Sequence, residues 1–546
     1  AAAEAGQAGG DAATIEPVGI PIHVSAGGDR TMGKAAEEPG STGGTLVIGT
    51  LGAPASFNPL LASEIPADSI LNAIFEPLVE PHPDTLAPVG VLAASWHVDA
   101  RGLVWVFSLR EGVRWHDGAP LTAADVAFSY SLYLDPELGH PAAEKLAGVV
   151  TGIEAVGPGE LRVATSEPYV DLPLVLGRLP VVPEHVLGGV EIADLAEHPA
   201  STGADPALVA GTGPFRLAGV EPDGSIVTVA NPDYWDGAPA LERLIARPVA
   251  SQAEMIALLR AGEIDLGALS PGAVPAFEGL PVEIVDAPVL GSTLLGFNLN
   301  AQKTPLFQDE RVRRALLMAL DRESMVQEVR AGYGDVVPGT LPPNSWAARH
   351  DQIETRYPYD PAAARQLLDE AGWTTGADGI RARAGRRLSF TVVTNAENDV
   401  RDDYLDLIAE QWAAIGVGIE VQVEPFEEVV ARLTDSGDFE AFLLGYAWDV
   451  APDQSALFAC AAGRPAANLT GYCNQSVDRL LVRAGREFDP ERRAALYLEM
   501  QELVLADLPL AILDFPRAVY AITDRAHNVF PGTVNMYFNA EDWWLG

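Results

Sequence analysis

Residues 388–449 alternate strand and helix patterns, and this alternation constrains the fold more than any other feature of the chain. Strand patterns over 388–393, 419–423 and 439–444 are separated by helical patterns over about 400–415 and 429–433. Consecutive βα units predict an α/β fold with a mostly parallel, doubly wound sheet. Ligands of such sheets bind beyond the carboxyl ends of the strands. Two loops meet that description, 52–59 after the strand 45–50, and 445–454.

Other segments carry clear local signals. Apolar residues at helical spacing predict one helix from Asp309 to a stop at Gly332. A second helix is framed by Asp360 as N-cap, Pro361 at its first position and Gly372 as its stop. The alternating residues 103–110, a Glu-Gly turn and residues 113–115 predict a β-hairpin.

Compact catalytic and metal-binding motifs do not occur in the sequence. It has no HExxH, GxSxG, P-loop, EF-hand or CxxC pattern, and its nine histidines are scattered singly. Gly211-Thr-Gly213 lacks the third glycine of a dinucleotide fingerprint, so it predicts a structural turn. Trp115-His116-Asp117 is interpreted in the same way, as packing and turn residues beside a hairpin.

The net charge, the length and the cysteines of the chain exclude some classes of protein and leave others open. A net charge of −41 disfavours binding to nucleic acid and to anionic membrane surfaces. No apolar run reaches the roughly 18 residues of a membrane helix, and residues 1–43, rich in Ala, Gly and Glu, are expected to form a flexible tether. The 546 residues predict three to four domain-sized units. Cys460 and Cys473 fit either incidental thiols or one disulfide of an exported protein.

Asp449 stands among aromatic residues at the carboxyl end of a strand. It stands between Trp448 and Val450 with Tyr446 close by, and Phe426 follows another strand of the same pattern. A carboxylate among aromatic rings is suited to bind a ligand's ammonium group by ion pairing and cation–π attraction. A solvated loop aspartate or an Asx turn explains the same residue, and the spacing leaves both interpretations open.

Several blocks, in order and spacing, resemble the extracellular solute-binding proteins of ABC importers, family 5, which include dipeptide- and oligopeptide-binding proteins. The resemblance runs from about residue 44 to 535. Its strongest block is AASWHVDARGLVWVFSLREGVRWHDG at 93–118, followed by PLTAADV at 120–126. The other blocks are 211–215, 231–237, 262–265, 297–300, 311–322 and 472–478.

The resemblance implies a two-lobe α/β fold of the periplasmic-binding-protein type (type II), with an extra subdomain inserted in lobe I. Lobe I would comprise 44–61, 200–296 and 510–546, the inserted subdomain 62–199, and lobe II 297–509. The chain would cross the hinge near 297–300 and 508–514. The strand and helix alternation of 388–449 then lies within lobe II.

The resemblance also implies a peptide site. Asp449, after a Gly-aromatic pair, would bind the ligand's α-ammonium, and the ligand backbone would pair with the segment before it while the loop 53–57 closes from the other side. Arg401 is the nearest candidate for the ligand carboxylate. Cys460 and Cys473 resemble the disulfide of dipeptide-binding members. The predicted ligand-binding residues are Gly445, Tyr446, Ala447, Trp448, Asp449, Phe426, Ala53, Pro54, Ala55, Ser56, Phe57, Asn395 and Arg401.

The leading hypothesis is a non-enzymatic binding protein, exported to the periplasm or cell surface and possessing no cofactor. It would act as a monomer, with a short peptide as ligand and an ABC permease as partner, and a removed N-terminal segment is one route to lipid anchoring. Oligosaccharides, metal chelates and opines are alternative ligands in this family. From other classes, a secreted hydrolase with two paired carboxylates and an envelope-assembly lipoprotein remain open.

Overall fold

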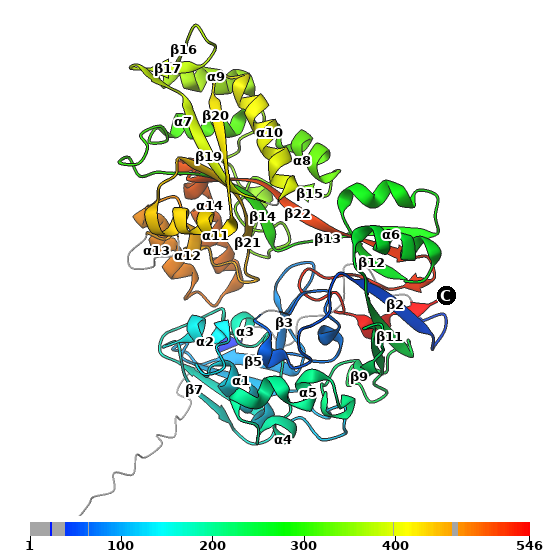
Figure 1. The fold of residues 1–546 in the computed structure, drawn as a ribbon. Helices are drawn as coiled ribbons and strands as arrows, with labels where there is room; N and C mark the ends of the chain where they lie inside the picture. The colour runs from blue at the N-terminus through cyan, green and yellow to red at the C-terminus, as the bar shows by residue number, and fades with distance from the viewer. Residues whose placement is uncertain (1–21, 24–38, 64, 397, 461–467) are drawn as a thin grey trace, which may run out of the picture.

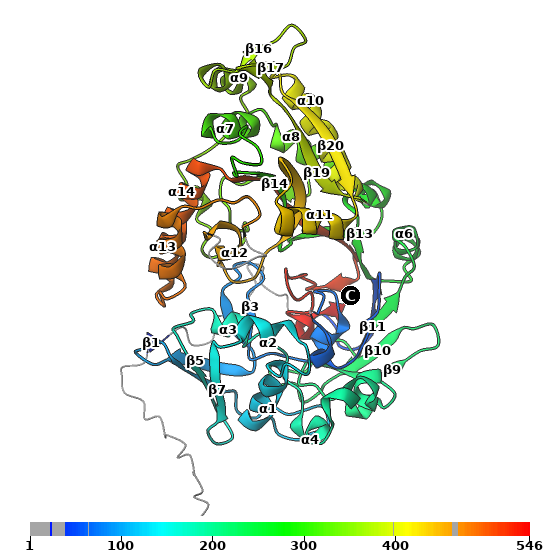
Figure 2. The same cartoon turned by 60° about the vertical axis from the view of Figure 1, so that its left-hand side comes forward.

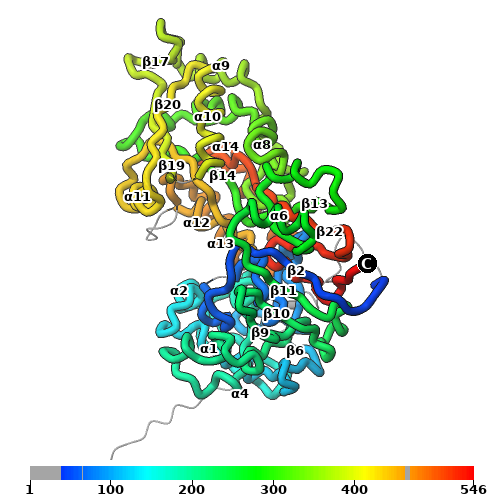
Figure 3. The backbone as a smooth tube through the Cα atoms, turned by 45° about the vertical axis from the view of Figure 1, so that its right-hand side comes forward, coloured from blue at the N-terminus to red at the C-terminus, as the bar shows by residue number. Residues whose placement is uncertain are grey.

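The computed structural model describes residues 22–23, 39–63, 65–396, 398–460 and 468–546. They form two bodies, one above the other in Figure 1, and the tube of Figure 3 shows the long strand β22 (Leu510–Thr523) running from one to the other. We call the described residues from β14 (Gly291–Phe297) to α14 (Pro490–Asp507) the upper body, and those before β14 and after β22 the lower body.

One sheet of twelve strands extends through both bodies, in the order β20-β19-β21-β14-β22-β12-β2-β11-β10-β9 with β13 and β15 also paired to β22. The first part of β22 pairs with β14 and the second part with β12 and β13. This shared strand hydrogen-bonds the two bodies together. The lower-body strands of the sheet are β2 (Thr45–Thr50), β9 (Phe215–Val220), β10 (Ile226–Ala230), β11 (Arg243–Pro248), β12 (Leu266–Leu269) and β13 (Val282–Pro288), with α6 (Gln252–Ala261) beside them.

The predicted βα alternation is confirmed in the upper body. Strands β19 (Ser389–Asn395), β20 (Gly418–Glu424) and β21 (Ala441–Ala447) are parallel, with α10 (Asp399–Ala413) and α11 (Phe426–Ala431) between them. Two details differ from the prediction. The whole sheet is mixed, because β14 and β22 are antiparallel to their neighbours. Residues 445–447, expected in a loop, are the last residues of β21.

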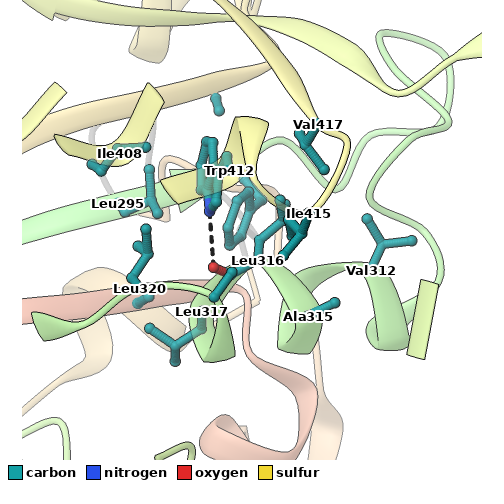
Figure 4. Packing of buried hydrophobic residues seen from close by; sticks show 14 of the residues in the cluster. Leu295, Val312, Ala315, Leu316, Leu317, Leu320, Ile408, Trp412, Ile415 and Val417 are labelled. Atoms are coloured by element: carbon teal, nitrogen blue, oxygen red, sulfur yellow. Dashed lines mark hydrogen bonds between the residues drawn. The ribbon is translucent and has the colours of Figure 1, made fainter. Parts of the chain in front are cut away.

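Helices cover both faces of the upper sheet. Along β14, Leu295 packs into a core with α7 (Glu310–Met318), α8 (Arg322–Arg330), α9 (Pro361–Glu370) and α10, while Leu294 packs into a core with α11, α12 (Ser455–Phe458), α13 (Gln475–Ala484) and α14. This is the period of two that a doubly covered strand requires. Figure 4 shows the first core, where the buried Trp412 indole N–H donates to the Leu316 carbonyl at 2.9 Å.

The helix predictions after residue 300 are half right. Asp360 caps α9 as expected, accepting from the amides of Ala362 and Ala363. The single helix predicted from Asp309 to Gly332 is two helices, α7 and α8. The chain breaks between them because Asp321 turns its carboxylate to the Ser324 amide and caps a new helix.

The lower body contains a second sheet, of order β1-β5-β6-β8-β7. Its strands are β1 (Ile22–His23), β5 (Ala93–Val98), β6 (Val104–Leu109), β7 (Val150–Ala155) and β8 (Glu160–Thr165), packed with α1 (Ala123–Tyr133) around a core rich in tryptophan and tyrosine. The short elements nearby are β3 (Val79–Pro81), β4 (Pro88–Gly90), α2 (Pro141–Leu146), α3 (Leu172–Val175), α4 (Glu184–Leu187) and α5 (Pro199–Thr202).

Two sequence predictions for this region need correction. The predicted hairpin partner of β6 is wrong, since β6 pairs with β5 and β8, and residues 113–115 make only one isolated bridge, Arg114 to Pro120. Within the predicted tether 1–43, residues 22–23 pair with β5 as β1. Residues 1–21 and 24–38 lie outside the described part of the chain.

Candidate ligand-binding site

The last residues of β21 form an open strand edge. On one side they pair with β14 as far as Gly291 opposite Ala447, whereas β19 pairs only with Ala441 and Phe442. Because the Trp448 amide donates to the Leu290 carbonyl at 3.0 Å, the alternation of an antiparallel ladder turns the backbone groups of Gly445 and Ala447 away from β14. Both residues are exposed. Among the described strands none occupies this edge, so it can accept an added strand.

Asp449 lies two residues beyond that edge and is paired with a cation of the lower body. Its Oδ2 accepts from Nζ of Lys145 on α2, and its Oδ1 accepts from the Ala451 amide at 3.4 Å. Burial acts to raise the pKa of Asp449, but the charge and hydrogen bond of Lys145, with a weaker contribution from Arg178, bring the pKa below its ordinary value. Asp449 is therefore an ionised carboxylate in a cationic setting.

The aromatic residues near Asp449 differ in what they offer a ligand. Trp448 is buried and donates its indole N–H to Ser292 Oγ at 2.8 Å, and it meets the partly exposed Tyr446 edge to face with 4.8 Å between ring centroids. Phe426, at the first turn of α11, is 59 % exposed. Trp448 thus holds this segment against β14 from inside the protein, whereas Tyr446 and Phe426 present ring surface that a ligand can reach.

Arg401 and Asn395, predicted from sequence as ligand-binding residues, are brought together with Gly445. The Arg401 guanidinium donates to Asn395 Oδ1, and a Cβ placed on Gly445 would lie 2.7 Å from Arg401 Nη2. Arg401 makes no ion pair with any described residue; desolvation first, and then the charge of Arg330, lower its pKa. A half-buried guanidinium without a carboxylate, beside an open strand edge, suits an anionic group.

The loop 53–57 divides between surface and core. Ala53 and Ala55 are exposed and Pro54 and Ser56 are half-buried, whereas Phe57 is 7 % exposed and packs into the lower-body core. Hydrogen bonds from Ser56 Oγ and the Phe57 amide to the Ser201 carbonyl, at 3.0 and 2.8 Å, anchor the loop. No hydrogen bond or ion pair of the described residues joins it to 445–449.

A cavity of about 380 Å³ opens between the two bodies beside this edge. Ala447 of the upper body and Leu290, the residue before β14, line it on one side, and the lower body also contributes Arg178 and the acidic residues Glu76, Glu80 and Glu541. Glu76 accepts hydrogen bonds from Tyr234 Oη at 2.8 Å and from the Trp235 indole at 3.1 Å. The charged groups stand in a mainly apolar lining, and Arg178 also lowers the pKa of Asp449.

The two bodies meet again on the other side of Asp449, where the start of α3 faces α14. Arg493 of α14 donates to Asp171 at 2.6 Å, and these two charged residues are 4 % and 5 % exposed. Around them, Arg486 pairs with Glu167 at 3.1 Å and Phe488 packs on Trp105 with centroids 5.8 Å apart. We call these contacts the border. It joins segments more than 300 residues apart in the sequence, as Figure 2 shows for α3 and the helices above it.

Sequence reasoning missed the cations of this site. Lys145 and Arg178 lie on segments whose sequence carries no binding signal, and Asp449 stands more than 250 positions away from both. The pairing of Arg493 with Asp171 was missed for the same reason. Only the three-dimensional contact identifies such residues.

The structure also decides the expectations for the two cysteines and for the motifs around Gly211 and His116. Cys460 and Cys473 are bonded to each other, so the disulfide is confirmed. His116 holds the Gly211–Gly213 turn, accepting from the Gly211 amide at 3.2 Å and contacting the Gly213 carbonyl at 3.0 Å, so both motifs are structural. In the part of the chain described, His, Cys, Asp and Glu side chains form no group of three suited to a metal ion, and no helix has the length and apolarity to cross a membrane.

Comparison with known proteins places this geometry in a family. Residues 87–468 match the bacterial extracellular solute-binding proteins, family 5. The chain is 29 % identical to the oligopeptide-binding protein AppA of Bacillus subtilis over 94 % of this chain and 93 % of that protein, and 32 % identical to Protein XP55 of Streptomyces lividans over 88 % and 85 %.

Solved structures agree. AppA of B. subtilis in complex with a nonapeptide matches with a TM-score of 0.68 over 93 % of this chain and all of that chain, at 29 % identity. HbpA2 of Haemophilus parasuis, at 21 % identity, shares the fold with a TM-score of 0.78 over 92 % of this chain and all of that one. The predicted fold class, a two-lobe α/β fold of the periplasmic-binding-protein type, is confirmed. The chain belongs to family 5 of the bacterial extracellular solute-binding proteins.

Proposed function

We propose that this protein captures short peptides between its two bodies, outside the cytoplasm, and delivers them to the permease of an ABC importer. The observation that carries the proposal is the open edge of β21 ending in the ionised Asp449. A peptide added as a strand satisfies the free backbone groups of Gly445 and Ala447 whatever its side chains are. Asp449 then receives the α-ammonium.

The other end of the ligand meets Arg401. In an extended chain, each residue advances about 3.3 Å, so the four positions from Gly445 to Asp449 span roughly 13 Å. An extended peptide of three or four residues bridges that distance between its ammonium and its carboxylate. Its side chains would contact Tyr446, Phe426 and the cavity next to Ala447.

The rest of the assignment follows the same proposal. Lobe I corresponds to 44–61, 200–296 and 510–546, the inserted subdomain to 62–199 and lobe II to 297–509, with β22 as a hinge strand. The protein works as a monomer without catalysis or a cofactor. The likeness to AppA, named as an oligopeptide-binding protein, supports peptide rather than sugar or metal chelate as the ligand.

Calorimetry with tri- and tetrapeptides tests the proposal. The proposal has the two bodies close on the peptide and bury the pair between its ammonium and Asp449. Removing one partner of a buried charge pair at an interface costs about 2–5 kcal/mol, so D449N should weaken binding at least 30-fold. D438N is the matched control, because Asp438 pairs with Lys303 at 3.7 Å on an exposed surface away from the edge. Equal affinity of D449N and wild type for every peptide that binds would refute the ammonium site. Thermal stabilisation by cello-oligosaccharides or Ni²⁺ alone would refute the peptide ligand.

A further inference from the structure

Lys145 places an ammonium group of the protein at the position proposed for the ligand's ammonium. The residue lies on α2, on the surface of the lower body that faces the upper body in Figures 1 and 2. Its Nζ donates to Asp449 Oδ2. A lysine side chain ends in the same primary ammonium, with three donors, as a peptide's N-terminus. The internal pair therefore imitates the contact that a peptide would make.

The choice of lysine is unusual in this chain. Only three of its 35 basic residues are lysine, at positions 34, 145 and 303. The neighbouring ion pairs of the border use arginine, in Arg493–Asp171 and Arg486–Glu167. Arginine holds a carboxylate with a rigid fork, whereas lysine contributes a flexible point charge. The cation at Asp449 is thus the kind that exchanges most readily.

The pair is accessible, and the border does not depend on it. The Lys145 and Asp449 side chains are 46 % and 33 % exposed, so water and a ligand can reach both. The buried Arg493–Asp171 pair and the packing of Phe488 on Trp105 join the same two bodies separately. Breaking the Lys145 contact leaves those contacts in place.

We propose that Lys145 is an internal competitor for the ammonium site, so that a peptide binds Asp449 by exchange with Lys145. The inference rests on the proposed function. It predicts selectivity, because only a ligand with its own cation can replace the one that is lost. A peptide with an acetylated N-terminus would leave Lys145 in place.

The first experiment measures affinity by calorimetry with trialanine and N-acetyl-trialanine. K145Q should bind trialanine two- to five-fold more tightly than wild type, and the gain should vanish in K145Q/D449N. Its binding should depend more strongly on salt than that of wild type, because the ion pair with the ligand is then formed outright instead of being exchanged for an internal one. K303Q is the matched control, because Lys303 is similarly exposed, at 37 %, and pairs with Asp438. Unchanged or weaker trialanine binding by K145Q overturns the inference, and so does the absence of trialanine binding in both wild type and K145Q.

The second experiment follows Lys145 directly, by amine acetylation with a water-soluble ester and mass spectrometry, with Lys303 as internal reference. D449N should raise the Lys145 labelling rate at least three-fold, and trialanine should raise it likewise in the wild type, whereas N-acetyl-trialanine should not. If trialanine binding requires Asp449 but leaves Lys145 labelling unchanged or slower, the exchange is refuted and the proposed function stands. If wild type and D449N bind trialanine equally, the proposed ammonium site itself fails.

Discussion

The ion pair between Asp171 and Arg493 offers a direct measurement of how firmly the two bodies are joined. Both residues are almost fully buried, 2.6 Å apart, and Arg493 lies over the rings of Trp346 and Tyr497 at 5.6 and 5.5 Å. Burial raises the pKa of Asp171 more than the charge of Arg493 lowers it. The pair is thus held in surroundings that do not favour isolated charges.

Replacing Asp171 with Asn leaves the Arg493 guanidinium buried without a counter-charge. Breaking a buried pair in this way costs about 3–5 kcal/mol, so D171N should lower the free energy of unfolding by that amount. One oxygen of Asp171 and Nε of Arg493 have no hydrogen-bond partner in the described structure. Because the pair is incompletely satisfied, the apolar double replacement D171L/R493M should return stability to within about 1 kcal/mol of wild type.

Urea unfolding of the ligand-free protein, followed by tryptophan fluorescence and circular dichroism, measures these differences. The control is E167Q at the same border, since Glu167 and Arg486 are 55 % and 56 % exposed and such surface pairs contribute about 0–1 kcal/mol. If D171N costs no more than E167Q, the pair is hydrated in solution. The reasoning would then be refuted, because the bodies would stand apart without ligand.

Three further predictions concern single positions. G445V should weaken trialanine binding at least ten-fold by calorimetry and change stability little, because its side chain would displace Arg401 and cover the open edge; unchanged affinity contradicts strand addition there. C460S/C473S should lower the free energy of unfolding in urea by about 3 kcal/mol, since the disulfide closes a loop of 13-residue separation; an unchanged unfolding curve contradicts it. Burial lowers the pKa of His116 to about 4, whereas its pKa in the unfolded chain is near 6.5. Between these two pH values the unfolded state binds more protons than the folded state, so the free energy of unfolding decreases as the pH falls. From pH 7 to 5 that loss is about 2 kcal/mol, and H116Q should remove it; equal slopes of stability against pH refute it.

Local sequence signals predicted correctly those helices and strands in which capping residues and apolar spacing indicate the same structure. Asp360 and Gly372 frame α9 as expected, and the βα alternation of 388–449 is present. The errors arise where a residue is compatible with two different local structures. Asp321 fits the exposed face of one long helix but caps a second one. Gly445 is typical of a loop, yet it belongs to β21, where the Arg401 guanidinium occupies the space a side chain would take.

The candidate site was predictable only on the upper body. The Gly-aromatic pattern and Asp449 are contiguous in sequence, so a pattern can reveal them. Lys145 stands 304 positions away from Asp449, and nothing in its own neighbourhood distinguishes it from a surface lysine. Lys145 becomes relevant only in the folded protein, where β22 joins the two bodies and α2 of the lower body lies against Asp449 of the upper body.

Two of the ion pairs between the bodies, Asp171–Arg493 and Lys145–Asp449, differ in burial and therefore in the work needed to break them. Opening the Asp171–Arg493 contact would leave two buried charges without a partner or move them into water, which is costly. The Lys145–Asp449 pair is already in contact with water and separates at a cost of about 1 kcal/mol or less. In the proposed mechanism the Asp171–Arg493 pair aligns the bodies, and the Lys145–Asp449 pair breaks when the ligand binds. Substitution at Lys145 should therefore change peptide affinity, and substitution at Asp171 should change the stability of the joined bodies. The two properties can change independently because different pairs determine them.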